Sequence, residues 1–409
     1  MLTAENRVIV AVSGGADSMC LLHVLREIGL KVTGVAHFNH LLREEAGEDE
    51  AFVSEAASRM GIPFYRAEAR VGEAPGNLEQ AGRWARREFF LGLMRDGAGE
   101  RVALGHTRDD QAETVLFRVV RGSGLAGLAG IHPVTGDGFV RPLIQVSRED
   151  VLEFLRAREI AWREDATNRD LRFARNRIRH EILPRLRMEN PRINGTLAQL
   201  ADLAFEEERW WRENLADRLV ETAGGVEFRT AELTESGRAV ARRLVRTAIL
   251  RAKGDLRGIE FQHVDRIIDI ENGRRLRLPG VEVTRSFDWV RLCRSETAPG
   301  VVPVEVTVPG TYEAPDGAGL IRVEVDAACA NLKVDLAARI ELRAWRPGDH
   351  YRPVGKSRDR KLKDMFQSAR VPSWRRRFWP ILEGDGKILW AREFGAAEGA
   401  GIRISEIPR

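Results

Sequence analysis

In the first half of the chain, hydrophobic and polar positions follow two alternating patterns. Short runs rich in β-branched residues predict strands at 7–12, 31–37, 63–67 and 101–105. Longer segments with apolar residues at helical spacing predict helices at 18–28, 48–60, 78–95, 111–120 and 148–160. Strands that alternate with helices form a parallel sheet covered on both faces, and ligands bind beyond the carboxyl ends of its strands. We therefore predict a Rossmann-like α/β domain.

The second half of the chain predicts smaller domains of a different kind. Helical spacing over 191–218 is followed by helical patterns at 238–253 and 258–271, and residues 274–292 alternate like a β-hairpin around Pro279-Gly280. A chain of 409 residues exceeds what one hydrophobic core usually organises. The expected parts are a parallel-sheet catalytic domain at 1–190, a helical connector at 191–218, a mostly helical α+β domain at 219–300 and a β-rich α+β domain at 301–409.

A glycine-containing turn joins the first predicted strand to the first predicted helix. It reads Ser13-Gly14-Gly15-Ala16-Asp17-Ser18. Such a turn points backbone N–H groups and the positive end of a helix dipole at an anion, and glycines allow phosphate oxygens to approach. The alternative is a connecting turn in which Asp17 or Ser18 caps the helix. The flanking serines and the apolar strand favour a phosphate site, and the missing Walker lysine disfavours a Ras-like or kinase-like enzyme.

Two carboxylates follow the fourth predicted strand. Asp110 and Glu113 are three residues apart at the start of a helix and therefore share one face of it. They could hold Mg²⁺ or an ammonium group, whereas the alternative is helix capping by Asp109 or Asp110. His106 directly precedes them and faces the same crevice, either as a satisfied polar residue or with a role in the reaction.

Charge is distributed unevenly along the chain. The net charge is only +4, yet residues 339–377 contain thirteen Lys or Arg and four Asp or Glu. Another basic stripe contains Arg175 and Arg179. Clustered cations favour a polyanion such as RNA, and the alternative in both places is a solvated basic face.

Several protein classes are disfavoured by composition. The three cysteines, Cys20, Cys293 and Cys329, lie far apart, which argues against a disulfide framework and against zinc or iron–sulfur sites made of paired thiols. No run of about 18 apolar residues could span a membrane. No secretory signal pattern precedes the first strand, so we expect a cytoplasmic protein whose mature chain starts near Met1.

The turn at 13–18 matches the SGGxDS pattern of the PP-loop, or N-type ATP pyrophosphatase, superfamily. Members of that superfamily split ATP between the α and β phosphates and transfer AMP to a carbonyl oxygen. Within it, the chain resembles the tRNA(Ile)-lysidine synthase family over nearly its whole length. The matching motifs are His37-Phe38-Asn39-His40 with Leu42-Arg43, Gly105-His106, Asp109 to Thr114, Arg121 to Gly124 with Gly127-Leu128, Arg141-Pro142-Leu143, Trp162 to Asn168, Arg175-Asn176 with Ile178-Arg179, and Arg346 to Asp349.

This resemblance implies ATP and Mg²⁺ as cofactors and assigns roles to individual residues. The implied catalytic residues are Asp17, His106, Asp110 and Glu113, with Asp17 as the metal ligand. The implied ATP-binding residues are Ser13, Gly14, Gly15, Ala16, Asp17, Ser18, His37, Phe38 and Gly105. The implied lysine-binding residues are Asp17, Arg86, Asp110 and Glu113, although Arg87 departs from the family's usual Tyr beside Arg86. The implied tRNA-binding residues are Arg175, Asn176, Arg179, Lys356, Arg358, Lys361 and Lys363, and both C-terminal domains are expected to contact tRNA.

The reaction that the resemblance implies is ligation of free L-lysine to C2 of the wobble cytidine of tRNA(Ile) with a CAU anticodon. It would proceed through an adenylated tRNA, release AMP and pyrophosphate, and change the codon read from AUG to AUA and the amino acid from Met to Ile. Three alternatives stay open: a PP-loop tRNA thiolase, a non-catalytic RNA-binding protein, and an amidotransferase-type ligase. The thiolase lacks support because no Cys-x-x-Cys is present. Whether the protein forms a homodimer stays open as well.

Overall fold

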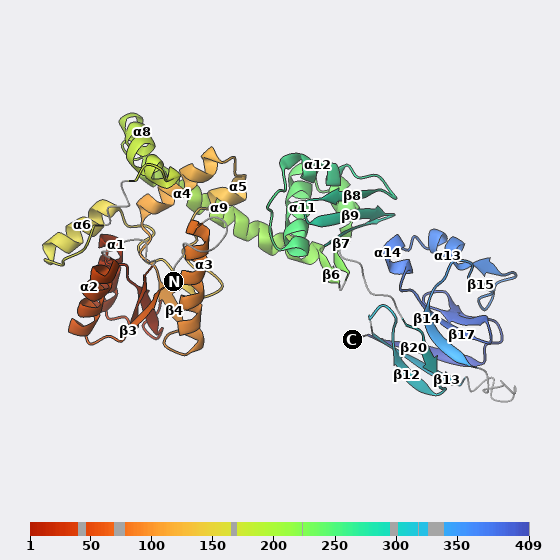
Figure 1. Cartoon of the computed structure of the whole chain (residues 1–409). Coiled ribbons are helices and arrows are strands. Elements are labelled where there is room, and N and C mark those ends of the chain that lie inside the picture. The colour runs from red at the N-terminus through yellow and green to blue at the C-terminus, as the bar shows by residue number, and fades with distance from the viewer. Residues whose placement is uncertain are drawn as a thin grey trace. The chain divides into compact units, whose positions relative to one another are not determined.

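The computed structural model describes residues 1–39, 46–68, 78–164, 170–222, 224–294, 302–317, 319–325 and 339–408. These residues form two compact units, Met1–Trp210 and Trp211–Arg409 (Figure 1). Parts of two predicted motifs, namely His40 with residues 42–43 and residues 165–168, lie outside the described ranges.

The first unit contains the predicted parallel sheet. Its strands have the order β3-β2-β1-β4-β5, and every neighbouring pair is parallel. Side chains of β1 alternate between its two faces, because Val8 and Val10 belong to one hydrophobic core and Ile9 to another. The strands are β1 Val8–Ala11, β2 Val32–Asn39, β3 Phe64–Glu68, β4 Arg101–Ala103 and β5 Phe139–Val140.

Helices cover both faces of this sheet, as predicted. Leu21 of α1, Val53 of α2 and Leu155 of α6 pack in the core on one face, whereas Phe90 of α3 packs with Ile9 on the other. The burial of these apolar stripes against the strands holds the layers together. The helices are α1 Ala16–Glu27, α2 Ala46–Arg59, α3 Leu78–Arg95 and α6 Arg148–Ala157.

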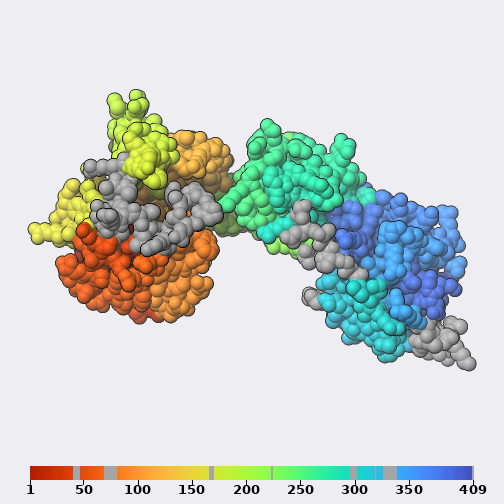
Figure 2. Space-filling view, in the orientation of Figure 1, coloured from red at the N-terminus to blue at the C-terminus, as the bar shows by residue number. Residues whose placement is uncertain are grey.

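The remaining helices of the first unit lie at the edge where the strands end (Figure 1). Helix α4 begins at Arg108, earlier than predicted, because Thr107 and Asp110 form a reciprocal capping box. A π-helical turn, η3, joins α7 to α8, and the end of α8 projects from the unit (Figure 2). These elements are α4 Arg108–Val120, α5 Leu125–Leu128, α7 Ala174–Arg177, η3 Ile178–Ile182, α8 Leu183–Glu189 and α9 Ile193–Leu215.

The second unit begins with an antiparallel sheet of order β6-β7-β10-β9-β8, packed against helices through a core that includes Phe228 and Leu244. The predicted hairpin around Pro279-Gly280 is present as β8 and β9. Strands β6 and β7, which the sequence pattern did not indicate, extend the sheet. The elements are η4 Ala216–Arg218, β6 Val220–Thr222, β7 Gly225–Arg229, α10 Ala231–Thr234, α11 Arg238–Lys253, α12 Phe261–Ile268, β8 Arg275–Leu278, β9 Val281–Ser286 and β10 Trp289–Cys293.

The rest of the second unit is β-rich, as predicted. Its sheets have the orders β11-β14-β17-β18-β19, β12-β13-β20 and β15-β16. No helix among the residues described above is long and apolar enough to cross a membrane. The elements are β11 Val304–Val306, β12 Gly310–Glu313, β13 Gly319–Val325, β14 Ile340–Ala344, β15 His350–Tyr351, β16 Arg360–Lys361, α13 Leu362–Ser368, α14 Ser373–Arg376, β17 Pro380–Gly384, β18 Lys387–Ala391, β19 Gly395–Ala396 and β20 Ile402–Pro408.

Candidate active site

The glycine turn between β1 and α1 is tied together by its serines. The Ser18 hydroxyl donates to the Gly15 carbonyl at 2.9 Å and accepts from the Ser13 backbone N–H at 3.2 Å. Gly14 has a φ of +92°, in the left-handed region that favours glycine. Gly15 precedes α1 without a side-chain cap, and the first N–H groups of any helix, here those of Ala16 and Asp17, have no intrahelical partner. The turn can therefore offer N–H groups to an anion.

Gly105 brings the end of β4 against this turn. A Cβ at position 105 would lie 3.1 Å from the Asp17 carbonyl carbon and 3.1 Å from the Ser18 backbone nitrogen. Such contacts are tighter than ordinary packing, so a side chain here would push β4 away from the start of α1. The glycine thus lets His106 and α4 follow directly beside the turn.

Asp17 is paired with an arginine that the sequence reasoning did not single out. Arg148 Nη1, at the start of α6, donates to Asp17 Oδ2 at 2.5 Å. Asp17 Oδ1 is buried and has no hydrogen-bond partner in the described part of the chain. Burial raises the pKa of Asp17 to about 6, Arg148 opposes this rise, and Asp110 adds to it. Asp17 therefore lies in a partly desolvated position with one carboxylate oxygen unused.

The raised pKa of Asp17 predicts a pH-dependent stability. A carboxyl that binds its proton more tightly in the folded protein stabilises the fold below its ordinary pKa of 3.8, and this contribution is lost as pH rises through about 6. The difference between a pKa of 3.8 in the unfolded chain and about 6 in the folded protein corresponds to about 3 kcal/mol in free energy of unfolding. Asparagine does not titrate in this range. We therefore expect the free energy of unfolding of Asp17→Asn minus that of wild type to increase by up to about 3 kcal/mol from about pH 4 to pH 7, measured by urea unfolding. A difference that stays constant over this range would contradict the prediction.

The two predicted carboxylates of α4 are held by two arginines of the α7–η3 segment. Arg175 contacts Glu113 Oε2 and Asp110 Oδ1, each at 2.9 Å. Arg179 contacts Glu113 Oε1 at 2.5 Å and Asp110 Oδ1 at 3.3 Å. Glu113 is only 2% exposed. Asp110 is thus a helix cap, which was the alternative given by the sequence, and also a member of this ion-pair cluster. Binding of Mg²⁺ or an ammonium group by Asp110 and Glu113 stays a prediction.

Arg175 and Arg179 therefore do not form the exposed basic face that was the alternative to RNA contact. They are four residues apart on one helical face and point at the carboxylates next to the glycine turn. The pKa of Arg179 is raised because its hydrogen bond to Glu113 and the charges of Glu113 and Asp110 outweigh burial. The Asn176 amide donates to the Asp170 carbonyl at 2.9 Å. The predicted contact of these three residues with tRNA stays a prediction.

His106 lies beside the same cluster. Its Nδ1 is buried and has no hydrogen-bond partner among the residues that the structure describes. Burial lowers the pKa of His106, Asp110 opposes this effect, and the charges of Arg141, Arg175 and Arg86 lower it further. The predicted part of Arg86 of α3 in lysine binding stays a prediction. The His106 ring is neutral at neutral pH.

Two of the implied ATP-binding residues, His37 and Phe38, lie near the end of β2. His37 is buried, and its Nδ1 lies 2.8 Å from the Val12 carbonyl oxygen. The ring of Phe38 lies 6.1 Å from that of Phe89 on α3. The first contact joins the end of β2 to the residue directly before the glycine turn, and the second joins it to α3.

Two further residues, Asp109 and Arg163, support the site; both lie in motifs that match the family, although the sequence alone gave neither of them a place in the site. Asp109 Oδ2 accepts from the Arg148 backbone N–H at 2.8 Å, and its Oδ1 accepts from the Asn194 amide at 2.6 Å. The Arg163 backbone N–H donates to the Gly14 carbonyl at 3.0 Å, and its side chain pairs with Asp49 at 2.5 Å. Asp109 thus positions the start of α6, which carries Arg148, and Arg163 holds the glycine turn from outside.

The predicted C-terminal basic residues belong to the second unit. Lys356, Arg358 and Lys363 are exposed, and Lys361 lies on β16. Phe366 and Trp374 lie near these cations in the sequence, which by itself leaves base stacking and core packing equally open for them. Phe366 is fully buried, and Trp374 is half-buried and donates from Nε1 to Glu227 at 2.7 Å. Core packing, rather than base stacking, therefore accounts for Phe366.

Known proteins match the chain over nearly its entire length. A family model described as PP-loop domain matches residues 2–186, and one described as TilS substrate C-terminal domain matches residues 340–404. The tRNA(Ile)-lysidine synthase of Solibacter usitatus is 47% identical, over 98% of this chain and 96% of that relative. The proteins of the same name from Geobacter sulfurreducens and Symbiobacterium thermophilum are 38% and 35% identical, over 92% and 90% of their lengths. The chain therefore belongs to the tRNA(Ile)-lysidine synthase family.

Proposed function

We propose that this protein uses ATP to adenylate the C2 carbonyl oxygen of the wobble cytidine in CAU-anticodon tRNA(Ile) and then joins free L-lysine to that carbon. The observation that carries the proposal is the close packing of Gly105, directly ahead of His106 and the carboxylates of α4, against Asp17 and Ser18 of the glycine turn, within a chain of which 98% matches a lysidine synthase. A pyrimidine carbonyl is a poor electrophile, and attached AMP makes its oxygen a good leaving group.

The glycine turn is proposed to hold ATP, and Asp17 is proposed to hold Mg²⁺. The unused, buried Asp17 Oδ1 suits a cation. No cluster of three or more metal-ligating side chains occurs among the described residues. Mg²⁺ is commonly bound by one or two carboxylates together with substrate phosphates, so Asp17 beside ATP would be a sufficient protein ligand. The ion would offset negative charge on the departing pyrophosphate.

Lysine is proposed to bind at Asp110 and Glu113. Its ammonium group would share the carboxylates that Arg175 and Arg179 contact here, and the arginines would then be available to phosphate oxygens. The ε-amine must lose a proton to a nearby base before it attacks. Its nitrogen then bonds to C2, the bond between C2 and the AMP-bearing oxygen breaks, and AMP leaves with that oxygen. His106, whose Nδ1 has no hydrogen-bond partner among the described residues, is proposed to form a hydrogen bond with the substrate.

The tRNA is proposed to bind both units. Lys356, Arg358, Lys361 and Lys363 would contact its backbone in the second unit, and residues 219–300 would take part in recognition. A tRNA thiolase is the second candidate, because it would also adenylate a base carbonyl. It is disfavoured since Cys20 is buried and the other cysteines lie more than 250 residues away in sequence.

The proposal predicts incorporation of labelled lysine into RNA. Purified protein, ATP, Mg²⁺ and a CAU tRNA(Ile) transcript should give one labelled lysine and one AMP for each modified tRNA. The matched control is the same transcript with uridine at the wobble position, in which label should fall to background because the acceptor base is absent. If ATP is bound but no label enters the cytidine transcript, the proposed function is wrong.

A further inference from the structure

Helices α1 and α6 of the first unit are joined by an ion pair at each end. At the end far from the glycine turn, Arg158 donates from Nε and Nη2 to the two carboxylate oxygens of Glu27, at 2.8 Å and 2.7 Å. At the end beside the turn, Arg148 donates to Asp17 from Nη1 alone, at 2.5 Å. The two pairs join the same helices, but only the first of them is bidentate.

The pair beside the glycine turn leaves three polar atoms unused. Within the described part of the chain, Nε and Nη2 of Arg148 have no acceptor, and Asp17 Oδ1 has no hydrogen-bond partner. The Arg148 side chain is 41% exposed, and neither nitrogen is among the buried atoms that lack a partner, so solvent can reach both. Nε and Nη2 form the edge of a guanidinium group that can take two oxygens of one anion, as Arg158 does with Glu27.

The backbone of Arg148 is fixed independently of its ion pair. Its N–H donates to Asp109 Oδ2 at 2.8 Å, and Ser147 caps α6 in a reciprocal box with Asp150. Leu155 of the same helix is fully buried in the core that α6 shares with α1. The guanidinium group therefore extends from a rigid base, which lowers the entropy lost when it binds a ligand.

The place of Arg148 in its helix is unfavourable for a cation that only joins two helices. Arg148 is the first residue of α6, where the helix dipole is positive, whereas Arg158 lies at the opposite end, where a cation is stabilised. Helix α1 also begins within the glycine turn. Two helix N-termini and a guanidinium group thus meet at Asp17, and such an arrangement attracts an anion with several charges.

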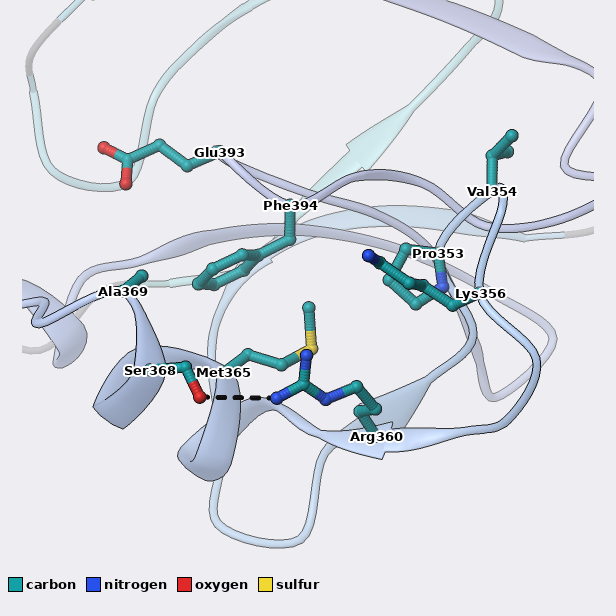
Figure 3. Close-up of a pocket in the computed structure, with 9 residues that line it drawn as sticks. All are labelled: Pro353, Val354, Lys356, Arg360, Met365, Ser368, Ala369, Glu393 and Phe394. Carbon is teal, nitrogen blue, oxygen red and sulfur yellow. Dashed lines mark hydrogen bonds between the residues drawn. The ribbon is translucent and has the colours of Figure 1, made fainter.

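A second arginine with an incompletely used guanidinium group lies in the C-terminal part of the chain. Arg360 donates from Nη2 to the Ser368 hydroxyl at 3.3 Å and lines a pocket of about 360 Å³ (Figure 3). Met365 and Phe394 give this pocket an apolar wall. Its lining residues include no glycine turn, so nothing there identifies an anion. Arg360 is therefore a control for the loss of one arginine charge.

We propose that Arg148 binds oxygens of the β or γ phosphate of ATP through Nε and Nη2, while its Nη1 keeps Asp17 in place. This inference rests on the proposed function, because it takes ATP as the ligand of the glycine turn. Asp17 Oδ1 stays available to Mg²⁺, so the ion and the guanidinium group would both offset charge on the pyrophosphate as it leaves. Arg148 is then a substrate-binding residue as well as the partner of Asp17.

The test compares an ATP analogue with AMP, which lacks the β and γ phosphates. Each nucleotide is titrated calorimetrically into the full-length protein with Mg²⁺, and the analogue is α,β-methylene ATP, which resists cleavage between the α and β phosphates. Arg148→Gln should weaken binding of the analogue about tenfold, because charge-assisted hydrogen bonds to phosphate are strong. Its affinity for AMP should stay within about twofold of wild type.

Two control variants remove the same charge elsewhere. Arg158→Gln breaks the other ion pair between α1 and α6, and Arg360→Gln removes the arginine charge in the second unit. Both variants should bind the analogue and AMP within about twofold of wild type. A loss in Arg158→Gln equal to that in Arg148→Gln would overturn the proposal, because loosening of α6 from α1 would then explain the effect.

Two further results would also overturn the proposal. One is wild-type affinity for the analogue in Arg148→Gln, and the other is an equal loss for the analogue and AMP, which would make Arg148 only a support of the turn. If Arg148→Gln does not fold, Arg148→Lys gives the same comparison, since lysine keeps the charge beside Asp17 but lacks the planar fork. It should lose at least about threefold in affinity for the analogue alone. Wild-type protein that binds neither nucleotide would instead contradict the proposed function.

Discussion

Replacement of Asp17 by asparagine is expected to slow lysine incorporation by roughly a hundredfold or more. The change keeps the shape of the side chain but removes its charge from the place where the glycine turn, Arg148 and the carboxylates of α4 meet. An amide cannot replace a carboxylate as partner of Mg²⁺ beside ATP phosphates. Initial rates with labelled lysine at saturating ATP and tRNA measure the effect.

The control for Asp17→Asn lies at the other end of the same helix. Glu27 ends α1, is half-exposed and pairs with Arg158 at 2.7 Å. Glu27→Gln removes the same charge and should leave the rate within about twofold of wild type, because exposed ion pairs contribute little. If Asp17→Asn kept more than a tenth of the wild-type rate, Asp17 would not have the role proposed for it.

Replacement of Glu113 by alanine is expected to damage both stability and lysine use. It would leave the guanidinium groups of Arg175 and Arg179 without the buried carboxylate that contacts both of them. Breaking a buried ion pair in this way costs about 3–5 kcal/mol, and the lower end applies here because the arginines are 34% and 25% exposed. In addition, the KM for lysine should rise at least about tenfold, since one of its two proposed carboxylate partners is lost.

A second variant separates these two effects. In Glu113→Ala/Arg179→Gln, one unpaired charge is removed together with the carboxylate, so part of the lost stability should return in urea unfolding. The KM for lysine should stay high, because the carboxylate is still missing. A double variant with a wild-type KM would show that Glu113 serves only to hold the arginines and does not bind lysine.

Much of the first unit could be predicted from the sequence, because its signals are local. The hydrophobic periodicity of strand β1 and of helices α1 and α3 is visible within each segment. The glycine turn at 13–18 likewise contains the glycines and serines that define it. Asp110 and Glu113 share a face by helical spacing alone. Strands β6 and β7 were missed because they are short and lie next to a long helix.

The partners of the site residues depended on contacts between distant parts of the chain. Arg148 lies 131 residues from Asp17, and Arg175 lies 62 residues from Glu113. No pattern in a single sequence marks such pairs, since each arginine fits equally well on an exposed helix face. The pocket beside Phe394 likewise joins β16, α13 and the turn after β18.

The sequence by itself therefore determined the parallel sheet, the glycine turn and the chemical types of the residues near it, because helices, strands and turns depend on neighbouring residues. Only the tertiary structure decided which charges meet. It placed Arg148 on Asp17, directed Arg175 and Arg179 at the carboxylates of α4, and left Lys356 and Arg360 with no carboxylate at ion-pair distance among the described residues. The physical reason is that electrostatic energies and pKa values depend on distance and burial in space, which are defined only once the chain has folded.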